Sequence, residues 1–263
     1  MNISNVNFLK SPLERLLRFK KLYTSPTSLV DFAPNNYFEF PENCQIPNLG
    51  YIYETIFGRL PKTLLEIGAF DGISYSNSSG LIQAGWNAIL LEPVPEYASL
   101  CRSRYNNNPR VSIYEIAVSN FIGFEQIALC GPLSSTDNDL VKEFQQLPWA
   151  SSSVTSNSIE VKTTTLRTFL EDHGTTDISL FIVDVEGSES KVFSEFENIS
   201  FRPAMIIVEL TDFHPTLKSK RIEHLEVGMK IQKCGYTIIY KDSINTVFVR
   251  DHIVDLFIRS DNY

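Results

Sequence analysis

From Tyr51 onward the sequence alternates short apolar runs with segments of helical periodicity. This alternation favours a mainly parallel sheet with helices on both faces, because parallel strands need crossover connections between them. Seven apolar runs predict strands at Thr63–Ile67, Ala88–Leu91, Val111–Ala117, Ser179–Val183, Met205–Glu209, Thr237–Tyr240 and Thr246–Val249. The intervening periodic segments predict helices at Ser76–Ala84, Pro95–Tyr105, Leu166–Asp172, Ser188–Phe196 and Lys220–Cys234.

The last two predicted strands are separated only by residues 241–245. This connection is too short for a helical crossover, so the two strands are predicted to form an antiparallel hairpin. The predicted fold class is therefore an α/β, Rossmann-like fold whose seven-stranded, mainly parallel sheet ends in an antiparallel hairpin.

Residues 1–50 differ in character and are predicted to be an N-terminal extension to a domain spanning residues 51–263. A basic segment places leucines at helical spacing, and a proline-containing connector, Thr24–Pro47, follows it. Such a helix can bind an anionic membrane surface, but it can also pack on its own chain or on a second subunit as a homo-oligomer contact. Packing is favoured because a single short helix with few aromatic residues is a weak membrane signal. The leucines are Leu9, Leu13, Leu16 and Leu17.

Residues 131–158 interrupt the alternation of strands and helices. The segment is rich in Ser, Thr, Asn and Asp, and its aromatic landmarks are Phe144 and Trp149. A long irregular insertion in an α/β domain is more often a lid or a binding loop than part of the scaffold. We therefore predict that it covers an active site or contacts the substrate; a solvated surface excursion is the alternative.

Charge and cysteine content exclude several classes of protein. A formal net charge of −8 repels phosphate backbones and disfavours a nucleic-acid partner. The four cysteines form no C-x-x-C pair, so neither a zinc site nor a disulfide framework is indicated. No secretory leader is recognisable, nor is there any run of about 18 consecutive apolar residues. A cytoplasmic protein is expected.

Glycines follow the first predicted strand at the turn toward the next helix, in the run Glu66 to Gly72. Such glycines let the backbone approach a ligand closely. Phe70 stands where the dinucleotide-binding pattern needs its second glycine, which argues against a nicotinamide-dependent oxidoreductase, and no phosphate-cradling Gly-Lys-Ser/Thr follows. This turn lacks the residues that bind phosphate groups but keeps the acidic residue Glu66. It therefore suits a cation such as S-adenosylmethionine, which carries a sulfonium and an amino group. Glu92, at the end of the second strand, can accept hydrogen bonds from both ribose hydroxyls.

These residues resemble the FkbM-type methyltransferases over about Leu64 to Leu210. The resemblance is carried by Leu65–Gly72, Ala84–Trp86, Leu91–Pro95, Ala117–Ser119, Val161–Leu166, Asp184–Glu189 and Ile206–Glu209. It implies a class I methyltransferase fold and methyl transfer from S-adenosylmethionine, usually to a hydroxyl of a sugar or polyketide, hence a small-molecule or glycan substrate. The sequence departs from the family pattern at Asp71, where Asn is common, and at Arg167, where Asp is common.

The resemblance also implies which residues contact the cofactor. Glu66, Gly68 and Gly72 would line its methionine part, Glu92 would hold the ribose, and Ala117 with Ser119 would border the adenine. The full predicted set is Glu66, Gly68, Ala69, Gly72, Glu92, Pro93, Ala117, Ser119 and Asp184.

Acidic residues also end the fourth and fifth predicted strands. Asp184 and Glu186 leave one face of an extended chain, and Glu209 ends the neighbouring strand. These three and His214 are the predicted catalytic residues. In one mechanism, a carboxylate or His214 removes the proton of the acceptor hydroxyl. In the other, Asp184, Glu209 and Asp212 hold a Mg²⁺ that orients and acidifies the hydroxyl.

Other functions stay open at this stage. The acceptor atom could be a nitrogen or a carboxyl oxygen, because no acceptor code is readable. A non-catalytic binding or scaffold protein with a Rossmann-like domain is the alternative from another class. The joint presence of Glu66, Gly68, Gly72 and Glu92 argues against it. His224 has no motif context and is interpreted as a surface or internally satisfied histidine.

Overall fold

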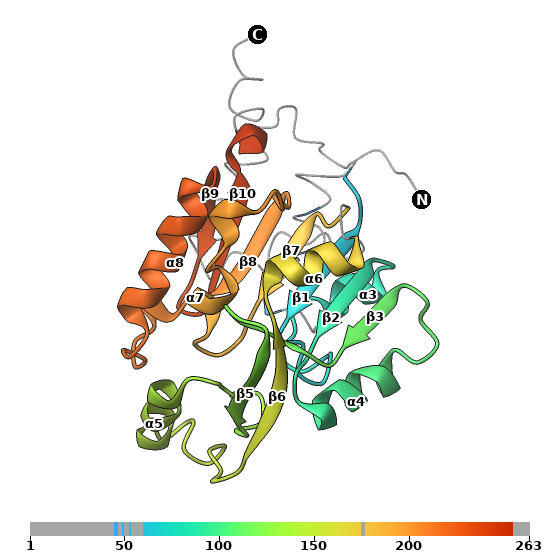
Figure 1. The fold of residues 1–263 in the computed structure, drawn as a ribbon. Helices are drawn as coiled ribbons and strands as arrows, with labels where there is room; N and C mark the ends of the chain where they lie inside the picture. Colours follow the sequence, from blue (N-terminus) through green and yellow to red (C-terminus); the bar gives the residue numbers. More distant parts are fainter. Residues whose placement is uncertain (1–44, 47–48, 50–52, 54–59, 175–176, 255–263) are drawn as a thin grey trace, which may run out of the picture.

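A computed structural model describes residues 60–174 and 177–254, together with positions 45, 46, 49 and 53. Its main sheet has seven strands in the order β3-β2-β1-β7-β8-β10-β9 (Figure 1). The first five are parallel, and β10 is antiparallel to both β8 and β9. This arrangement confirms the predicted fold class. The strands are β1 Thr63–Ile67, β2 Asn87–Leu91, β3 Val111–Tyr114, β7 Leu180–Val183, β8 Met205–Glu209, β9 Tyr236–Lys241 and β10 Asn245–Arg250.

Helices pack against both faces of this sheet, as the apolar runs predicted. Alternate residues of β7 show why: Leu180 and Ile182 enter one buried cluster, and Phe181 and Val183 enter the other. A strand buried on both faces needs an apolar side chain at every position. Helix α3 (Ser79–Gln83) packs on the first face, and α6 (Leu166–His173), α7 (Glu189–Val192) and α8 (Arg221–Lys233) pack on the second. Further helices with described bounds are α4 (Pro95–Arg104), α5 (Asn138–Gln146), η1 (Phe196–Asn198) and η2 (Thr211–Phe213).

A second sheet of three strands has the order β4-β6-β5. Its strands are β4 (Ala117–Val118), β5 (Gly123–Ala128) and β6 (Ser158–Thr164). The predicted single strand Val111–Ala117 is therefore wrong, because β3 ends at Tyr114 and Ala117 pairs with β6. Strands β5 and β6 were not predicted. The exposed positions of β6 are polar, and β5 exposes Phe124, so β5 lacks the usual alternation of buried apolar and exposed polar residues.

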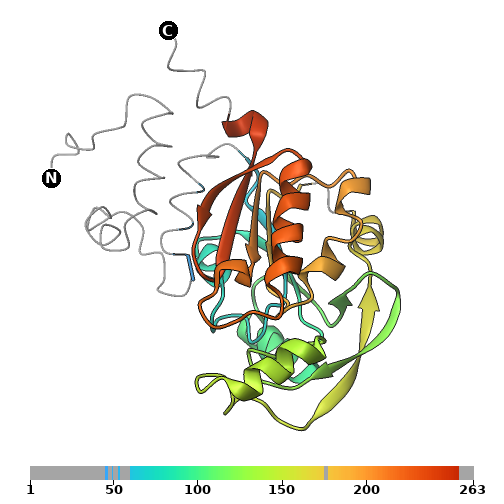
Figure 2. The same cartoon turned by 90° about the vertical axis from the view of Figure 1, so that its left-hand side faces the viewer.

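The insertion at residues 131–158 is also more regular than predicted. Its central helix, α5, begins at an N-cap, Asp137, whose carboxylate accepts hydrogen bonds from the backbone N–H groups of Asp139 and Leu140 at 3.0 and 2.8 Å. Apolar residues at helical spacing, among them Leu140 and Phe144, bury one face of the helix. Figures 1 and 2 show α5 and the three-stranded sheet at the same end of the main sheet.

The predicted leucine-rich helix and its connector lie outside the described residues, apart from Gln45 and Ile46. Just beyond the connector, Leu49 and Tyr53 join Ile46 in the buried core, where the Tyr53 ring lies 4.4 Å from that of Trp86. Among the helices that the structure describes, none combines the length and apolar character needed to cross a bilayer.

Candidate active site

A cavity of about 650 Å³ lies at the carboxyl ends of β1, β2, β7 and β8. Ligands of open α/β sheets bind at this edge. We call the part formed by the turns after β1 and β2 the sheet side. The opposite part, formed by residues of the insertion and by residues 214–217, is the insertion side. The carboxylates at the ends of β7 and β8 lie where the two sides meet.

The turn after β1 needs glycine at Gly68. Its φ is +91°, and a Cβ added there would lie 1.6 Å from the carbonyl oxygen of Asp184. The Gly68 N–H donates to the Leu91 carbonyl at 2.9 Å, and the Asp184 N–H donates to the Ile67 carbonyl at 3.0 Å. The turn is thus held between its two neighbouring strands, and it leaves Gly68 and Ala69 at the cavity wall.

Gly72 does not line the cavity, contrary to its predicted role beside the methionine part of the cofactor. A Cβ at this position would lie 2.9 Å from the ring of Tyr105, so Gly72 faces helix α4. The Tyr105 hydroxyl donates to the Gly72 carbonyl at 2.5 Å. The glycine therefore serves the close packing of the turn against α4.

Two buried acids flank this turn, as the sequence predicted. Glu66 accepts a hydrogen bond from the Ser78 hydroxyl, and Glu92 accepts from the backbone N–H groups of Phe70 and Val94 at 2.8 and 2.9 Å. Burial raises the pKa of Glu66 to about 8 and that of Glu92 to about 7. The donors in these hydrogen bonds are all neutral groups. A bound cation would therefore favour the ionised forms of both acids. These residues fit a ligand that brings positive charge to the turn.

The residues predicted to border the adenine differ in their position relative to the cavity. Ala117 and Pro93 line the cavity, whereas Ser119 does not. The Ser119 hydroxyl donates to Glu125 at 3.2 Å, and its N–H donates to the Thr164 carbonyl at 2.8 Å. Glu125 itself lines the cavity and is ion-paired with Lys191. The sequence analysis missed Glu125 because it missed strand β5.

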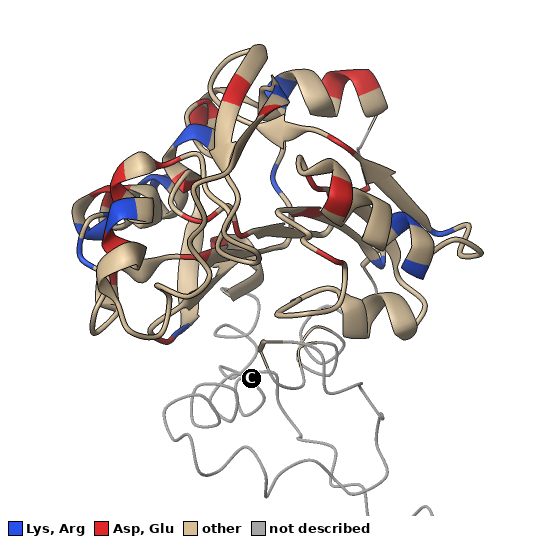
Figure 3. Cartoon of the chain, turned by 90° about the horizontal axis from the view of Figure 1, so that it is seen from below, with Lys and Arg blue, Asp and Glu red and all other residues tan. Residues whose placement is uncertain are grey.

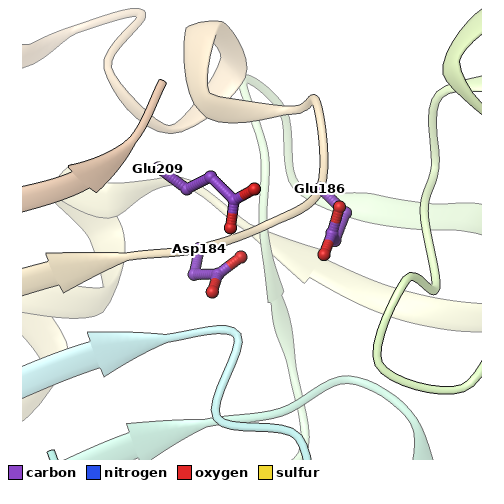
Figure 4. Close-up of side chains that lie close together, drawn as sticks. All are labelled: Asp184, Glu186 and Glu209. Carbon is purple, nitrogen blue, oxygen red and sulfur yellow. The ribbon is translucent and has the colours of Figure 1, made fainter. Parts of the chain in front are cut away.

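Asp184, Glu186 and Glu209 converge at the meeting point of the two sides, as predicted (Figure 4). One carboxylate oxygen from each lies within 4.8 Å of the others. Burial raises the pKa of Asp184 to about 6 and those of Glu186 and Glu209 well above their usual range, and the neighbouring carboxylates add to both of the latter shifts. A hydrogen bond joins Asp184 to Glu209, which favours a proton on Glu209 and charge on Asp184. Like charges this close share protons.

The loop that carries Glu186 has a strained backbone. Glu186 has a φ of +50°, which residues other than glycine rarely adopt, and Gly187 follows it at +93°. The Ser135 hydroxyl of the insertion donates to the Glu186 carbonyl at 2.5 Å. A strained conformation of this kind persists only where surrounding contacts hold it in place, and such residues cluster at functional sites.

A buried pair behind the carboxylates joins the two loops that carry them. Glu189 and His224 are 0% and 1% exposed, and their Oε2 and Nε2 atoms lie 2.8 Å apart. The other oxygen of Glu189 accepts from the N–H groups of Val185 and Gly187 at 3.2 and 3.3 Å. Nδ1 of His224 accepts from the Thr211 N–H at 2.8 Å. We call this contact the Glu189–His224 brace. The Nδ1 atom of His224 is satisfied by Thr211, whereas its Nε2 atom lies close to Glu189 Oε2 without hydrogen-bond geometry. This link was not predicted from the sequence.

Asp212 does not join the carboxylate cluster, contrary to the predicted metal-ligand set. Both of its carboxylate oxygens contact the ammonium of Lys241, at 2.8 and 2.6 Å. Asp184 and Glu209 are joined instead by Glu186, which the sequence analysis had placed only among the catalytic residues.

His214 lines the cavity, but its geometry does not suit a base. Its Nδ1 accepts from the backbone N–H groups of Thr216 and Leu217 at 3.2 and 3.0 Å. In the neutral ring the proton is then on Nε2, which can donate a hydrogen bond but cannot remove a proton. Burial lowers the pKa of His214, which favours this neutral form.

The insertion supplies apolar walls. Leu133, Phe144 and Trp149 line the cavity, and the Trp149 ring centroid is 5.9 Å from that of His214. Polar contacts fix the insertion to the loop after β8, since Glu143 accepts from the N–H groups of Lys218 and Ser219 at 2.8 and 3.1 Å. The insertion therefore forms part of the cavity wall.

Comparison with known proteins identifies the family. The sequence model described as "Methyltransferase FkbM domain" matches residues 66–238. This range includes Glu66, Gly68 and Glu92, the carboxylate cluster and the insertion. No curated protein was found to match the chain.

Solved structures resemble the chain at low similarity. An O-methyltransferase from Bacillus cereus in complex with SAH is 15% identical, with 94% of this chain and 95% of that chain covered at a TM-score of 0.41. The O-methyltransferase TomG from Streptomyces achromogenes, in complex with SAM, is 12% identical, with 90% and 89% covered at a TM-score of 0.42. Scores this low carry no argument about function, which rests on the family match.

Proposed function

The chain belongs to the FkbM methyltransferase domain family and is an S-adenosylmethionine-dependent methyltransferase, and from this premise we propose that it methylates a hydroxyl group of a carbohydrate or polyketide-like compound. The observation that carries the proposal is the cluster of Asp184, Glu186 and Glu209 at the carboxyl edge of the sheet, inside the range matched by the family. A cluster of carboxylates beside the cofactor turn can take up the proton that an acceptor hydroxyl loses.

The sheet side of the cavity is the proposed cofactor site. Gly68 and Ala69 would let the cofactor approach the backbone, Glu66 would face its positive charge, and Glu92 would accept from its ribose. Ala117 and Pro93 would border the adenine. Bound S-adenosylmethionine supplies an electrophilic methyl group on a sulfonium, with S-adenosylhomocysteine as the leaving group. Two buried acids at this turn support a cationic ligand there.

The insertion side is the proposed acceptor site, and residues 131–158 act as its wall or lid. The acceptor oxygen attacks the methyl carbon as the carbon–sulfur bond breaks, and the hydroxyl proton passes to a carboxylate of the cluster. Asp184 is the proposed base, because its pKa of about 6 leaves it ionised at neutral pH. General-base help of this kind contributes about 10²–10⁴-fold to the rate. His214 would donate a hydrogen bond from Nε2 to the acceptor.

A Mg²⁺ held by Asp184, Glu186 and Glu209 is the alternative mechanism, because hard oxygen ligands at this spacing suit that ion. Methyl transfer that persists in EDTA at its full rate would exclude this alternative. Loss of turnover on chelation, with recovery on addition of Mg²⁺, would instead support this alternative, in which the three carboxylates would hold the ion and the ion would acidify the acceptor hydroxyl.

Two measurements test the proposed function. Isothermal titration calorimetry should show S-adenosylhomocysteine binding to the full chain, and weaker binding to Glu92→Gln, which keeps the size of the side chain but loses one carboxylate acceptor. A screen for S-adenosylhomocysteine release should then find turnover with alkyl glycosides or hydroxylated polyketide-like compounds, reduced about 10²-fold or more in Asp184→Asn. A chain that binds no S-adenosylhomocysteine would fit the scaffold alternative. Turnover confined to amines or carboxylic acids would move the acceptor atom to nitrogen or to a carboxyl oxygen.

A further inference from the structure

We infer that the acceptor carries no anionic group: the acceptor site takes a neutral hydroxyl compound, or one with an ammonium group, that presents an apolar face. This inference rests on the proposed function, because it specifies the class of acceptor for the same cavity. It excludes uronic acids, phosphorylated or sulfated sugars and free carboxylic acids as preferred acceptors.

The charge of the cavity wall is the first observation. Six acidic side chains line the cavity: Glu66, Glu92, Glu125, Asp184, Glu186 and Glu209. Among the wall residues that the structure describes there is no Lys or Arg, and the single histidine, His214, is held neutral by burial. The cofactor brings one net positive charge to Glu66 and Glu92. The cluster of Asp184, Glu186 and Glu209 is then left without a cation.

Three lysines beside the cavity are paired with acids. Lys191 is paired with Glu125, Lys220 with Asp137, and Lys241 with Asp212. Arg221, near the rim, donates to the backbone carbonyl of His214 at 3.0 Å. Figure 3 shows Lys and Arg on several sides of the fold, so the missing positive charge is local to the cavity and is not a consequence of the net charge of the chain.

An anionic acceptor would therefore meet two costs. It would leave water without a charged partner, which is unfavourable unless a donor replaces the lost solvation. It would also be repelled by the acidic side chains that line the cavity. A neutral acceptor avoids both costs, and an ammonium group lowers the second. The wall thus selects against anions by leaving them unpaired.

The second observation is the apolar surface beside these acids. Leu133, Trp149, Pro215 and Leu217 line the insertion side. Leu217 is buried, whereas Trp149 is 49% exposed, so its ring is available at the wall. An aromatic ring of this kind packs on apolar groups or on the C–H face of a sugar. The acceptor thus combines a hydroxyl group, directed to the acids, with an apolar face.

Three probes of similar size and different charge test the inference on the protein saturated with S-adenosylhomocysteine. Benzyl alcohol, benzylammonium and benzoate are titrated separately, and their dissociation constants are measured by ligand-observed and protein-observed NMR. We expect benzoate to bind at least about tenfold more weakly than benzyl alcohol, and benzylammonium to bind at least as tightly as the alcohol. Because these probes need no turnover, the result does not depend on finding the natural acceptor.

A matched pair of variants, Trp149→Lys and Trp149→Gln, assigns the effect to the cavity wall. Both remove the ring from a half-exposed position, and only the first adds a cation. Trp149→Lys should improve benzoate binding relative to Trp149→Gln and weaken benzylammonium binding. Benzoate binding equal to that of benzyl alcohol in the original chain would overturn the inference, and so would the failure of all three probes to bind. Either result leaves the proposed function intact if S-adenosylhomocysteine binds, whereas failure of that titration removes the proposed function itself.

Discussion

The two sides of the cavity are built in different ways. The sheet side comes from consecutive residues at the ends of β1 and β2, and its shape depends on one glycine held between neighbouring strands. The insertion side depends on contacts between distant parts of the chain, such as Ser135 with Glu186 and Glu143 with Ser219. The first side is fixed by local backbone geometry, and the second by tertiary packing. Substitutions should therefore affect them differently.

The largest effect is expected at Gly68 on the sheet side. In Gly68→Ala, the new Cβ would lie 1.6 Å from the Asp184 carbonyl, so β1 and β7 must separate. We expect a loss of more than about 5 kcal/mol of folding free energy, or an unfolded chain, because the clash is with backbone. Urea unfolding measures the stability, and calorimetry measures S-adenosylhomocysteine binding in any folded fraction.

Gly85 provides the matched control for this substitution. Its φ of +95° resembles that of Gly68, but a Cβ at Gly85 meets nothing within 4 Å. Gly85→Ala should therefore show only the cost of the left-handed conformation, about 1–2 kcal/mol, with unchanged cofactor affinity. Equal losses in the two variants would show that backbone conformation, not the close approach to β7, explains the need for glycine at Gly68.

The same contrast explains what the sequence could predict. The main sheet, Gly68, Glu92 and the convergence of Asp184 with Glu209 follow from strand ends and parallel topology, which short apolar runs reveal. The packing role of Gly72 was not predictable, because it depends on Tyr105 from a later helix. The pairing of Asp212 with Lys241 likewise needs the register of β9 against β10 and β8. Strand β6 was missed because its exposed residues are polar, and β5 because its exposed Phe124 breaks the alternation of buried apolar and exposed polar residues.

A smaller but still large effect is expected at the Glu189–His224 brace. Glu189→Ala would leave His224 and the N–H groups of Val185 and Gly187 without their partner. Leaving buried N–H groups without an acceptor costs about 1–3 kcal/mol. His224→Ala should cost a similar amount, and the double variant should cost less than the sum of the two. Urea unfolding of the four proteins measures this coupling.

A substitution in the brace can also test whether the two sides of the cavity are independent. It supports the loops that carry Glu186 and Thr211, and it does not contact Gly68, Glu66 or Glu92. In folded Glu189→Gln, the cofactor affinity should stay within about threefold of the original value. Turnover should fall, because Gln keeps the acceptor for the backbone N–H groups but loses the charge of the carboxylate. A parallel fall in cofactor affinity would show that the two sides are not independent.

The smallest effect is the pH dependence of cofactor binding on the sheet side. Burial raises the pKa of Glu66 to about 8 and that of Glu92 to about 7, so both acids hold protons in the free protein at pH 6. Their raised folded-state pKa values contribute stability that is fully present below pH 4.5 and is lost as the pH rises toward 8. The amino group of S-adenosylhomocysteine favours the ionised acids, so cofactor binding releases protons and its affinity has the opposite dependence.

We therefore expect the dissociation constant of S-adenosylhomocysteine to fall about three- to tenfold between pH 6 and pH 8, while the melting temperature of the free protein falls over the same interval. Calorimetry in two buffers of different ionisation enthalpy counts the protons released. Glu66→Gln should flatten the slope, because one of the two titrating groups is gone, whereas Glu160→Gln, at an exposed position of β6, should leave it unchanged. An affinity independent of pH in the original chain would mean that neither acid meets the positive charge of the cofactor. The sheet side would then not be the part of the cavity that binds a cation.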